Sequence, residues 1–240
     1  MSGHSKWAQI KRKKGSADAE RGRLFSKIAR AITLAVRSGD KNPASNYRLE
    51  TAIEKARSVN MPKDVIERAI AKATNVHESA LEEFLYEAYG PGGIALLIEG
   101  ISDNKNRSTQ EIKHLLSNHE GKLANPGTVQ WLFEKRTALE IPRRINTLLP
   151  DDIELAAIDA GAESIESDEN SMIIWTRTEA APGTKTALKQ KGITVGEVFN
   201  SYVPKNIISV SPETGALLTK LIDALEERDD VQNVYTNRDL

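Results

Sequence analysis

The sequence contains no cysteine among its 240 residues. This absence excludes disulfides, thiolate nucleophiles and cysteine-ligated zinc or iron–sulfur centres. Histidine is also scarce, with four copies. His114 and His119 are five positions apart, a spacing that places them on different faces of a helix, so we expect no metal site there. The sequence therefore predicts no metal and no other cofactor.

Long apolar runs are missing as well. No stretch approaches the roughly 20 apolar residues that span a bilayer, and the basic N-terminus lacks the apolar core of a signal peptide. Hydrophobic residues make up 39% and charged residues 28% of the chain, which is typical of a folded soluble protein. We therefore expect a cytoplasmic protein with no membrane partner.

Charge is distributed unevenly along the chain. The net charge of −1 hides a basic part, residues 1–78, with 17 basic and 8 acidic residues, and an acidic part, residues 79–240, with 16 basic and 26 acidic residues. A basic segment joined to an acidic remainder predicts that the first part alone is attracted to polyanions.

Positive charge is most concentrated between Met1 and Arg30, where nine Lys or Arg face two acids. The four consecutive cations of Lys11–Lys14 repel one another unless a polyanion is near. We therefore predict contact with nucleic acid, DNA or RNA, in which phosphate neutralisation dominates and affinity falls with salt. The residues assigned to this contact are Lys6, Trp7, Lys11, Arg12, Lys13, Lys14, Arg23, Lys27 and Arg30.

Two alternatives stay open for these residues. A run of charges is most often the solvated face of a helix. Trp7 can stack on an exposed base, or it can anchor the first helix on its neighbours. No pattern for recognising base edges is present, so no sequence specificity is predicted.

Residues 1–78 are predicted to be helical throughout. Ser5 and Ser16 can cap two successive helices that Gly15 separates, and the second helix is expected to end at Ser38-Gly39. Asn42 is expected to cap a third helix, and a fourth follows Pro62. In the second helix an apolar stripe of Phe25, Ile28, Ala29, Ile32 and Val36 lies opposite a basic stripe of Arg23, Lys27, Arg30 and Arg37.

The remaining residues predict an α+β fold. A hairpin turns at Gly90–Gly93, a helix capped by Asn106 or Ser108 follows, and Thr128–Glu134 reads as a strand. Residues 135–206 show the order strand, helix, strand, strand, helix, strand, which is ferredoxin-like. Residues 79–134 lack a closing helix and strand, which residues 207–240 supply. We therefore predict three domains: a basic helical bundle (1–78), an α+β domain (79–134 plus 207–240), and a ferredoxin-like domain (135–206) inserted in the second.

Other candidate motifs have simpler structural explanations. Gly90-Pro91-Gly92-Gly93 lacks the lysine of a phosphate-binding loop, and a hairpin explains it better. The polar loop Asp103–Arg107 is either a contact surface or, as we favour, a helix-capping loop. The acid pairs Asp151-Asp152 and Asp229-Asp230 are not joined to a His, Ser or Lys in the sequence, so no catalytic site is predicted.

Ordered motifs along nearly the whole chain resemble the YebC/PmpR family, which includes the mitochondrial translational activator of cytochrome c oxidase. They are Gly3-His4-Ser5-Lys6-Trp7, Arg21-Gly22 with Phe25-Ser26-Lys27, Asn60-Met61-Pro62-Lys63, Tyr89-Gly90-Pro91-Gly92-Gly93, Asp103-Asn104-Lys105-Asn106-Arg107, Ala157-Ile158-Asp159-Ala160-Gly161-Ala162, Val203-Pro204-Lys205-Asn206 and Val231-Gln232-Asn233-Val234-Tyr235-Thr236-Asn237. The chain departs from the family at Ser102 and Ser108, where threonine is expected, and at Ala124-Asn125, where a Gly-Thr-like pair is usual.

The resemblance implies an N-terminal helical domain, two α+β domains with the third inserted in the second, and a regulator of gene expression rather than an enzyme. Members are commonly described as DNA-binding transcriptional regulators, and others are linked to translation of proline-rich stretches at the ribosome. We therefore expect a non-catalytic nucleic-acid-binding regulator with no small-molecule substrate. The alternatives are a translation factor that binds RNA or the ribosome, and a protein-interaction scaffold.

Overall fold

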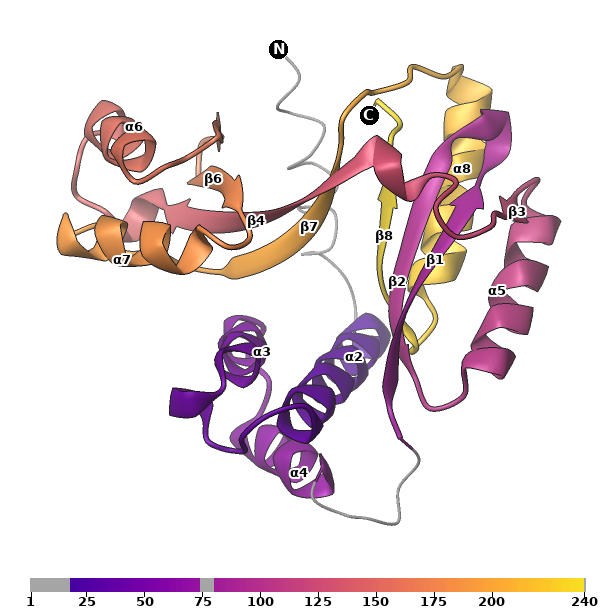
Figure 1. Cartoon of the computed structure of the whole chain (residues 1–240), viewed down its shortest axis with the longest axis horizontal. Coiled ribbons are helices and arrows are strands. Elements are labelled where there is room, and N and C mark those ends of the chain that lie inside the picture. Colours follow the sequence, from indigo (N-terminus) through magenta and orange to yellow (C-terminus); the bar gives the residue numbers. More distant parts are fainter. Residues whose placement is uncertain (1–17, 74–79, 240) are drawn as a thin grey trace. The chain divides into compact units, whose positions relative to one another are not determined.

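The structure of the chain, a computed structural model, describes residues 18–73 and 80–239 (Figure 1). These residues fall into two compact units. One consists of Glu134–Val203, and the other joins residues 18–133 to Pro204–Asp239. Within the described ranges, no helix is long and apolar enough to cross a membrane.

The N-terminal part of the larger unit is helical, as predicted. It comprises α2 (Asp18–Arg37), the 3-10 turn η2 (Pro43–Ser45), α3 (Tyr47–Ser58) and α4 (Lys63–Ala73). Thr33 on α2 also joins α2 to α4, because its hydroxyl donates to the carbonyl of Ala69 at 3.1 Å. The three helices share one apolar core: Ile28, Ile32, Ala35, Val36, Leu49, Ile53, Ala56, Met61, Ile66 and Ala69.

The predicted start of the third helix is wrong by several residues. Asn42 caps only the short turn η2, and α3 begins after Asn46, whose side chain accepts the N–H of Leu49. Asn46 is the buried residue of the two, and its amide also donates to the carbonyls of Ala35 and Asp40. That anchorage fixes where the helix begins. The predicted caps Ser5 and Ser16 and the break at Gly15 lie outside the described residues.

The larger unit also contains an antiparallel sheet with the strand order β3-β1-β2-β8. Its strands are β1 (Glu82–Tyr89), β2 (Ala95–Ser102), β3 (Lys122–Leu123) and β8 (Val231–Thr236). The predicted hairpin is confirmed, since β1 and β2 pair along their whole lengths around the turn Pro91–Gly93. Two segments far apart in sequence are thus combined in one sheet, because β8 pairs with β2.

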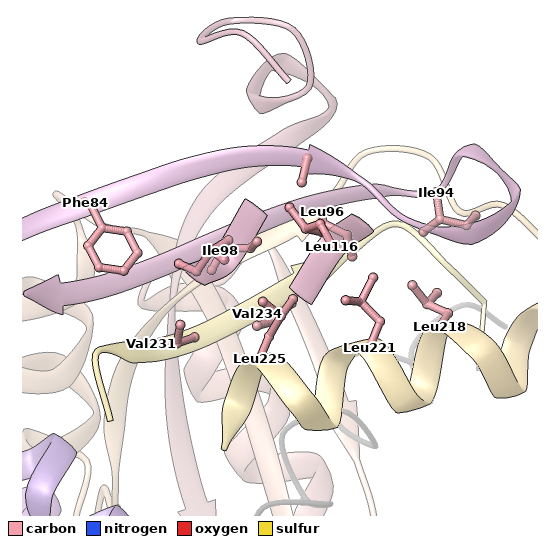
Figure 2. Packing of buried hydrophobic residues seen from close by; sticks show 12 residues of the cluster. Phe84, Ile94, Leu96, Ile98, Leu116, Leu218, Leu221, Leu225, Val231 and Val234 are labelled. Atoms are coloured by element: carbon pink, nitrogen blue, oxygen red, sulfur yellow. The ribbon is translucent and has the colours of Figure 1, made fainter. Parts of the chain in front are cut away.

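Two helices cover one face of this sheet. They are α5 (Lys105–Asn118) and α8 (Pro212–Glu226). Figure 2 shows Leu218, Leu221 and Leu225 of α8 directed towards the strands. The helix residues Ile112, Leu116 and those three leucines pack on Phe84, Ala88, Leu96, Ile98, Val231 and Val234 of the strands. Burial of these apolar side chains is the main stabilising contribution here.

Two sequence predictions in this region are corrected. The N-cap of α5 is Asn104 rather than Asn106 or Ser108, because the hydroxyl of Ser108 is used in a buried contact with Asp230. Thr128–Glu134 does not form one strand: it contains the 3-10 turn η4 (Gln130–Leu132), and β4 begins only at Phe133. The backbone N–H groups of this stretch bind a buried carboxylate, as described below.

The smaller unit has the predicted ferredoxin-like order. Its strands β4 (Phe133–Pro142), β5 (Ser164–Ser167), β6 (Ser171–Arg177) and β7 (Val198–Pro204) are arranged β5-β6-β4-β7, with α6 (Pro150–Asp159) and α7 (Ala181–Gln190) as the two crossovers. Strand β6 is antiparallel to both β4 and β5. Helix residues Ile153, Ala157 and Leu188 pack on one sheet face, and Ala138, Ile173, Trp175 and Val203 form a second cluster. The α+β fold class is confirmed.

The larger unit contains both the N-terminal helices and the sheet β3-β1-β2-β8, so the division into two units does not separate them. The prediction of three domains, with boundaries near residues 78, 134 and 206, stays a prediction.

Candidate nucleic-acid interface

The basic stripe of α2 contains all the predicted contact residues that the structure describes. Arg23, Lys27 and Arg30 lie at helical positions i, i+4 and i+7, so they share one face of α2. All three side chains are half-buried. The remaining predicted contacts lie outside the described residues: Lys6, Trp7, Lys11, Arg12, Lys13 and Lys14.

Lys27 and Arg30 make contacts that the sequence did not predict. The ammonium of Lys27 donates to the carbonyl of Glu226 at 2.6 Å, and the guanidinium of Arg30 donates to the carbonyl of Ile101 at 3.3 Å. Glu226 is the last residue of α8, and the carbonyls at a helix end carry partial negative charge. Arginine has five N–H donors, so the Arg30 side chain keeps donors beyond this bond.

Arg23 differs from its two neighbours on the stripe. Within residues 18–73 and 80–239, its side chain makes no ion pair. Other cations of the bundle are neutralised: Arg68 pairs with Asp64 at 2.6 Å and Lys63 with Glu67 at 3.4 Å. Arg23 is therefore the predicted contact residue on α2 whose charge is least compensated.

Glu87 is a functional-looking residue that sequence reasoning missed. It lies on β1, is only 5% exposed, and its carboxylate accepts the backbone N–H groups of Gly127 and Val129, each at 2.5 Å, and of Gln130 at 2.9 Å. Burial alone would raise the pKa of Glu87, but these N–H donors outweigh it and the pKa lies below its ordinary value. The only sign of this role in the sequence was an acidic residue between Tyr86 and Ala88 in a predicted strand.

The loop Asp103–Arg107 is a helix cap, as favoured from the sequence. The side chain of Asn104 accepts the N–H of Arg107, and Ser102 accepts the N–H of Asn104 at 2.9 Å. Asp103 pairs with Arg107 at 2.6 Å. A shallow hollow lies beside this loop, lined by Ala80, Glu82 and Ser102–Asn106. Its polar groups serve largely to begin α5.

The acid pair Asp229-Asp230 requires a correction, because Asp230 does have a serine partner. The hydroxyl of Ser108 donates to Asp230 at 2.5 Å, and the Arg228 guanidinium donates to both carboxylate oxygens at 2.9 Å. Asp230 is 5% exposed. A buried carboxylate held by arginine on both oxygens has a structural role here, because neither oxygen is available as a base. Arg228 also bonds Glu111.

The glycine turn Gly90–Gly93 uses its amides within the hairpin. Gly90 donates to the carbonyl of Ile94 at 2.8 Å, and Gly93 donates to Gly90 at 3.1 Å. The hairpin interpretation is therefore confirmed over a phosphate cradle. Among residues 18–73 and 80–239, no three His, Asp or Glu side chains gather in a metal-binding arrangement.

Comparison with known protein families gives matches along nearly the whole chain. Residues 5–76 match the family described as TACO1/YebC protein N-terminal domain, and residues 81–238 match TACO1/YebC second and third domain. A probable transcriptional regulatory protein from Kosmotoga olearia is 46% identical over 99% of this chain and 94% of its own length. One from Desulforamulus reducens is 43% identical over 99% of this chain and 98% of its own length.

A solved structure shows the same fold. The crystal structure of a conserved hypothetical protein from Aquifex aeolicus superimposes with a TM-score of 0.87 and 40% sequence identity. The match covers 98% of this chain and 97% of the other.

Proposed function

This chain belongs to the TACO1/YebC family, and we propose from its charge distribution that it is a nucleic-acid-binding regulator of gene expression with no catalytic activity. Its relatives are named probable transcriptional regulatory proteins, which favours a role in transcription through DNA. We propose phosphate contacts by Lys6, Lys11, Arg12, Lys13, Lys14, Arg23, Lys27 and Arg30, with Trp7 stacking on a base or anchoring the first helix on its neighbours.

The observation that carries this proposal is the surplus of positive charge in the helical part. Residues 18–73 hold 12 basic and 7 acidic residues, and the preceding residues 1–17 add five cations and no acid. The core of the bundle uses the opposite side of α2 from its basic stripe. Phosphate contact therefore needs no rearrangement of the apolar core.

A second candidate function is a translation factor that binds the ribosome or another structured RNA. A helix that reads the major groove must present its reading face to base edges. On α2 the basic stripe would have to serve as the reading face, but its side chains are half-buried. Two of its cations, Lys27 and Arg30, donate hydrogen bonds to carbonyls of the same unit. This arrangement suits contact with an irregular phosphate surface better than insertion into a groove.

We also propose that residues 1–78 act as a separate basic domain, with residues 79–134 plus 207–240 and the inserted residues 135–206 as the other two. The acidic excess beyond residue 79 concentrates the attraction for polyanions on the first domain.

The test measures retention on ribosomes and binding to duplex DNA across a salt series. The variant replaces Lys11–Lys14 by alanine. A matched control replaces Lys185 and Lys189 of α7 together with Lys191, which directly follows the helix, and so removes three positive charges from the smaller unit. Salt-resistant binding to particular duplexes, lost in the first variant, supports a transcriptional regulator.

Ribosome retention at physiological salt, lost in the Lys11–Lys14 variant and kept in the α7 control, supports the translation factor instead. If both variants bind as wild type does, Lys11–Lys14 are not the contact. A Lys11–Lys14 variant that keeps a complex with a protein partner but loses nucleic-acid binding supports the interaction scaffold.

A further inference from the structure

Trp131 is an exposed tryptophan held in a fixed orientation. Its side chain is 62% exposed, whereas Trp175 is 1% exposed. The indole N–H of Trp131 donates to the carbonyl of Thr128 at 2.9 Å. Tryptophan usually buries its large apolar surface. An indole that is fixed by a hydrogen bond and left open to solvent is typical of a binding surface.

The loop that carries Trp131 is held in place by hydrogen bonds to a buried carboxylate. Glu87 binds the N–H groups of Gly127, Val129 and Gln130, and Val129 is fully buried. Thr128 closes the turn, because its hydroxyl donates to the carbonyl of Asn125 at 2.6 Å. A loop that is ordered before binding loses little conformational entropy when a ligand arrives. The indole is therefore preorganised.

A lysine from a distant part of the chain lies next to this loop. The backbone N–H of Lys205 donates to the carbonyl of Leu132, the residue after Trp131, at 2.9 Å. The side chains of Lys205 and Asn206 are exposed. In the part of the chain that the structure describes, Lys205 forms no ion pair. The motif Val203-Pro204-Lys205-Asn206 thus lies next to the loop that carries Trp131.

We propose that Trp131 and Lys205 form a stacking site for an unpaired nucleobase of single-stranded nucleic acid. The base lies on the indole face, and the ammonium of Lys205 contacts the adjoining phosphate. A regular duplex does not fit this site, because its base faces are stacked on one another. The inference rests on the proposed function and deepens it, since it names a second contact outside the helical part.

The test uses the fluorescence of Trp131 in a Trp7→Phe background, where Trp175 remains as a buried internal reference. The probes are a single-stranded oligouridine and heparin, a polyanion without bases. We expect quenching by the oligonucleotide and none by heparin. In the same background, Trp131→Ala should weaken oligonucleotide binding about 5- to 150-fold, and Trp131→Phe should recover most of it.

Lys205→Ala should weaken binding less and reduce the slope of log affinity against log salt by about 0.7, as expected for loss of one phosphate contact with a single strand. The matched control is Leu149→Ala, which removes another large exposed side chain (68% exposed). It should leave oligonucleotide affinity unchanged. Thermal unfolding of each variant checks that the fold is retained.

Equal affinity of Trp131→Ala and its background protein overturns the stacking site, as does equal quenching by heparin. If Trp131→Ala keeps its oligonucleotide affinity but loses ribosome retention, the indole contacts something other than an unpaired base and the inference is wrong. Binding that disappears in the Lys11–Lys14 variant but survives Trp131→Ala overturns this inference alone. A wild-type protein that binds no nucleic acid overturns the proposed function with it.

Discussion

The hydroxyl of Ser108 lies 2.5 Å from a carboxylate oxygen of Asp230, although 122 residues separate the two along the chain. Ser108 is in the first turn of α5, and Asp230 immediately precedes β8. Arg228 holds the same carboxylate through two hydrogen bonds. This contact joins the beginning of one covering helix to the turn that follows the other.

Removing the Asp230 carboxylate should destabilise the protein strongly. Asp230→Ala leaves Arg228 without its buried partner, and we expect a loss of about 3–5 kcal/mol in the free energy of unfolding. Ser108→Ala removes one hydrogen bond to a charged group and should cost about 1.5–3 kcal/mol. Urea unfolding measures both. The neighbouring Asp229 is exposed, so Asp229→Ala should change little; a large effect there would contradict this explanation.

Acid should remove the contribution of Asp230 in a defined direction. Burial opposes ionisation, but the hydrogen bonds from Arg228 and Ser108 outweigh it, so the pKa of Asp230 is lowered from 3.8. The folded state therefore binds this proton less readily than the unfolded state. Its stabilisation is present above pH 3.8 and is lost as the pH falls through the lower folded pKa. Asp230→Asn should flatten the fall in Tm below pH 4, and an unchanged slope would argue against this assignment.

Glu87→Gln should loosen the loop that carries Trp131. A glutamine amide has one oxygen, so it cannot accept all three backbone N–H groups, and at least one of them loses its partner. We expect a loss of about 1–3 kcal/mol by urea unfolding. Glu83→Gln, on the same strand but exposed, is the matched control and should cost no more than about 1 kcal/mol. Equal losses in the two variants would show that the buried Glu87 carboxylate stabilises the protein no more than the exposed Glu83 carboxylate does.

Substitution by alanine should destabilise the protein at Gly100 and stabilise it at Gly183. A Cβ at Gly100 would lie 2.1 Å from the ring of Phe84 and 2.3 Å from the carbonyl of Asp230, so Gly100→Ala should destabilise by about 3 kcal/mol or more. A Cβ at Gly183 in α7 meets nothing within 4 Å. Gly183→Ala should stabilise by up to about 1 kcal/mol, because alanine favours the helix. Thermal unfolding distinguishes the two, and a fall in Tm for both would be inconsistent.

Arg23→Gln should weaken nucleic-acid binding without weakening the fold. The side chain makes no ion pair within the described residues, so stability should change by less than about 0.5 kcal/mol. Loss of one phosphate contact should reduce the slope of log affinity against log salt by about 0.9 for duplex DNA. Lys189→Gln, on α7, is the charge-matched control. An unchanged slope for Arg23→Gln would remove this residue from the proposed interface.

Local patterns predicted the elements well where packing and periodicity agree. The apolar stripe at Ile28, Ile32 and Val36 predicted the core face of α2, and all three residues are buried. The order of strands and helices after residue 135 predicted the ferredoxin-like sheet. These features depend on neighbours a few residues apart, so a single sequence is enough to find them.

Long-range polar contacts were not predictable in the same way. Asn42 and Asn46 are equally good caps in sequence, and only the buried bonds of Asn46 to Ala35 and Asp40 decide between them. Glu87 acts on amides 40 and more residues away. Lys27 and Arg30 looked free on a basic stripe, and their carbonyl partners come from α8 and β2. For the interface itself, the nine proposed residues stay a prediction.

The smaller unit leaves and rejoins the larger one at neighbouring points, where Lys205 donates its N–H to the carbonyl of Leu132. The strands that lead into and out of it, β4 and β7, are also adjacent in one sheet. The inserted stretch therefore resembles an oversized surface loop whose ends are already closed. Evolution can lengthen, shorten or exchange such a loop while the β3-β1-β2-β8 sheet keeps its pairing, so this junction is a natural place for relatives to differ in length and a practical site for domain grafting.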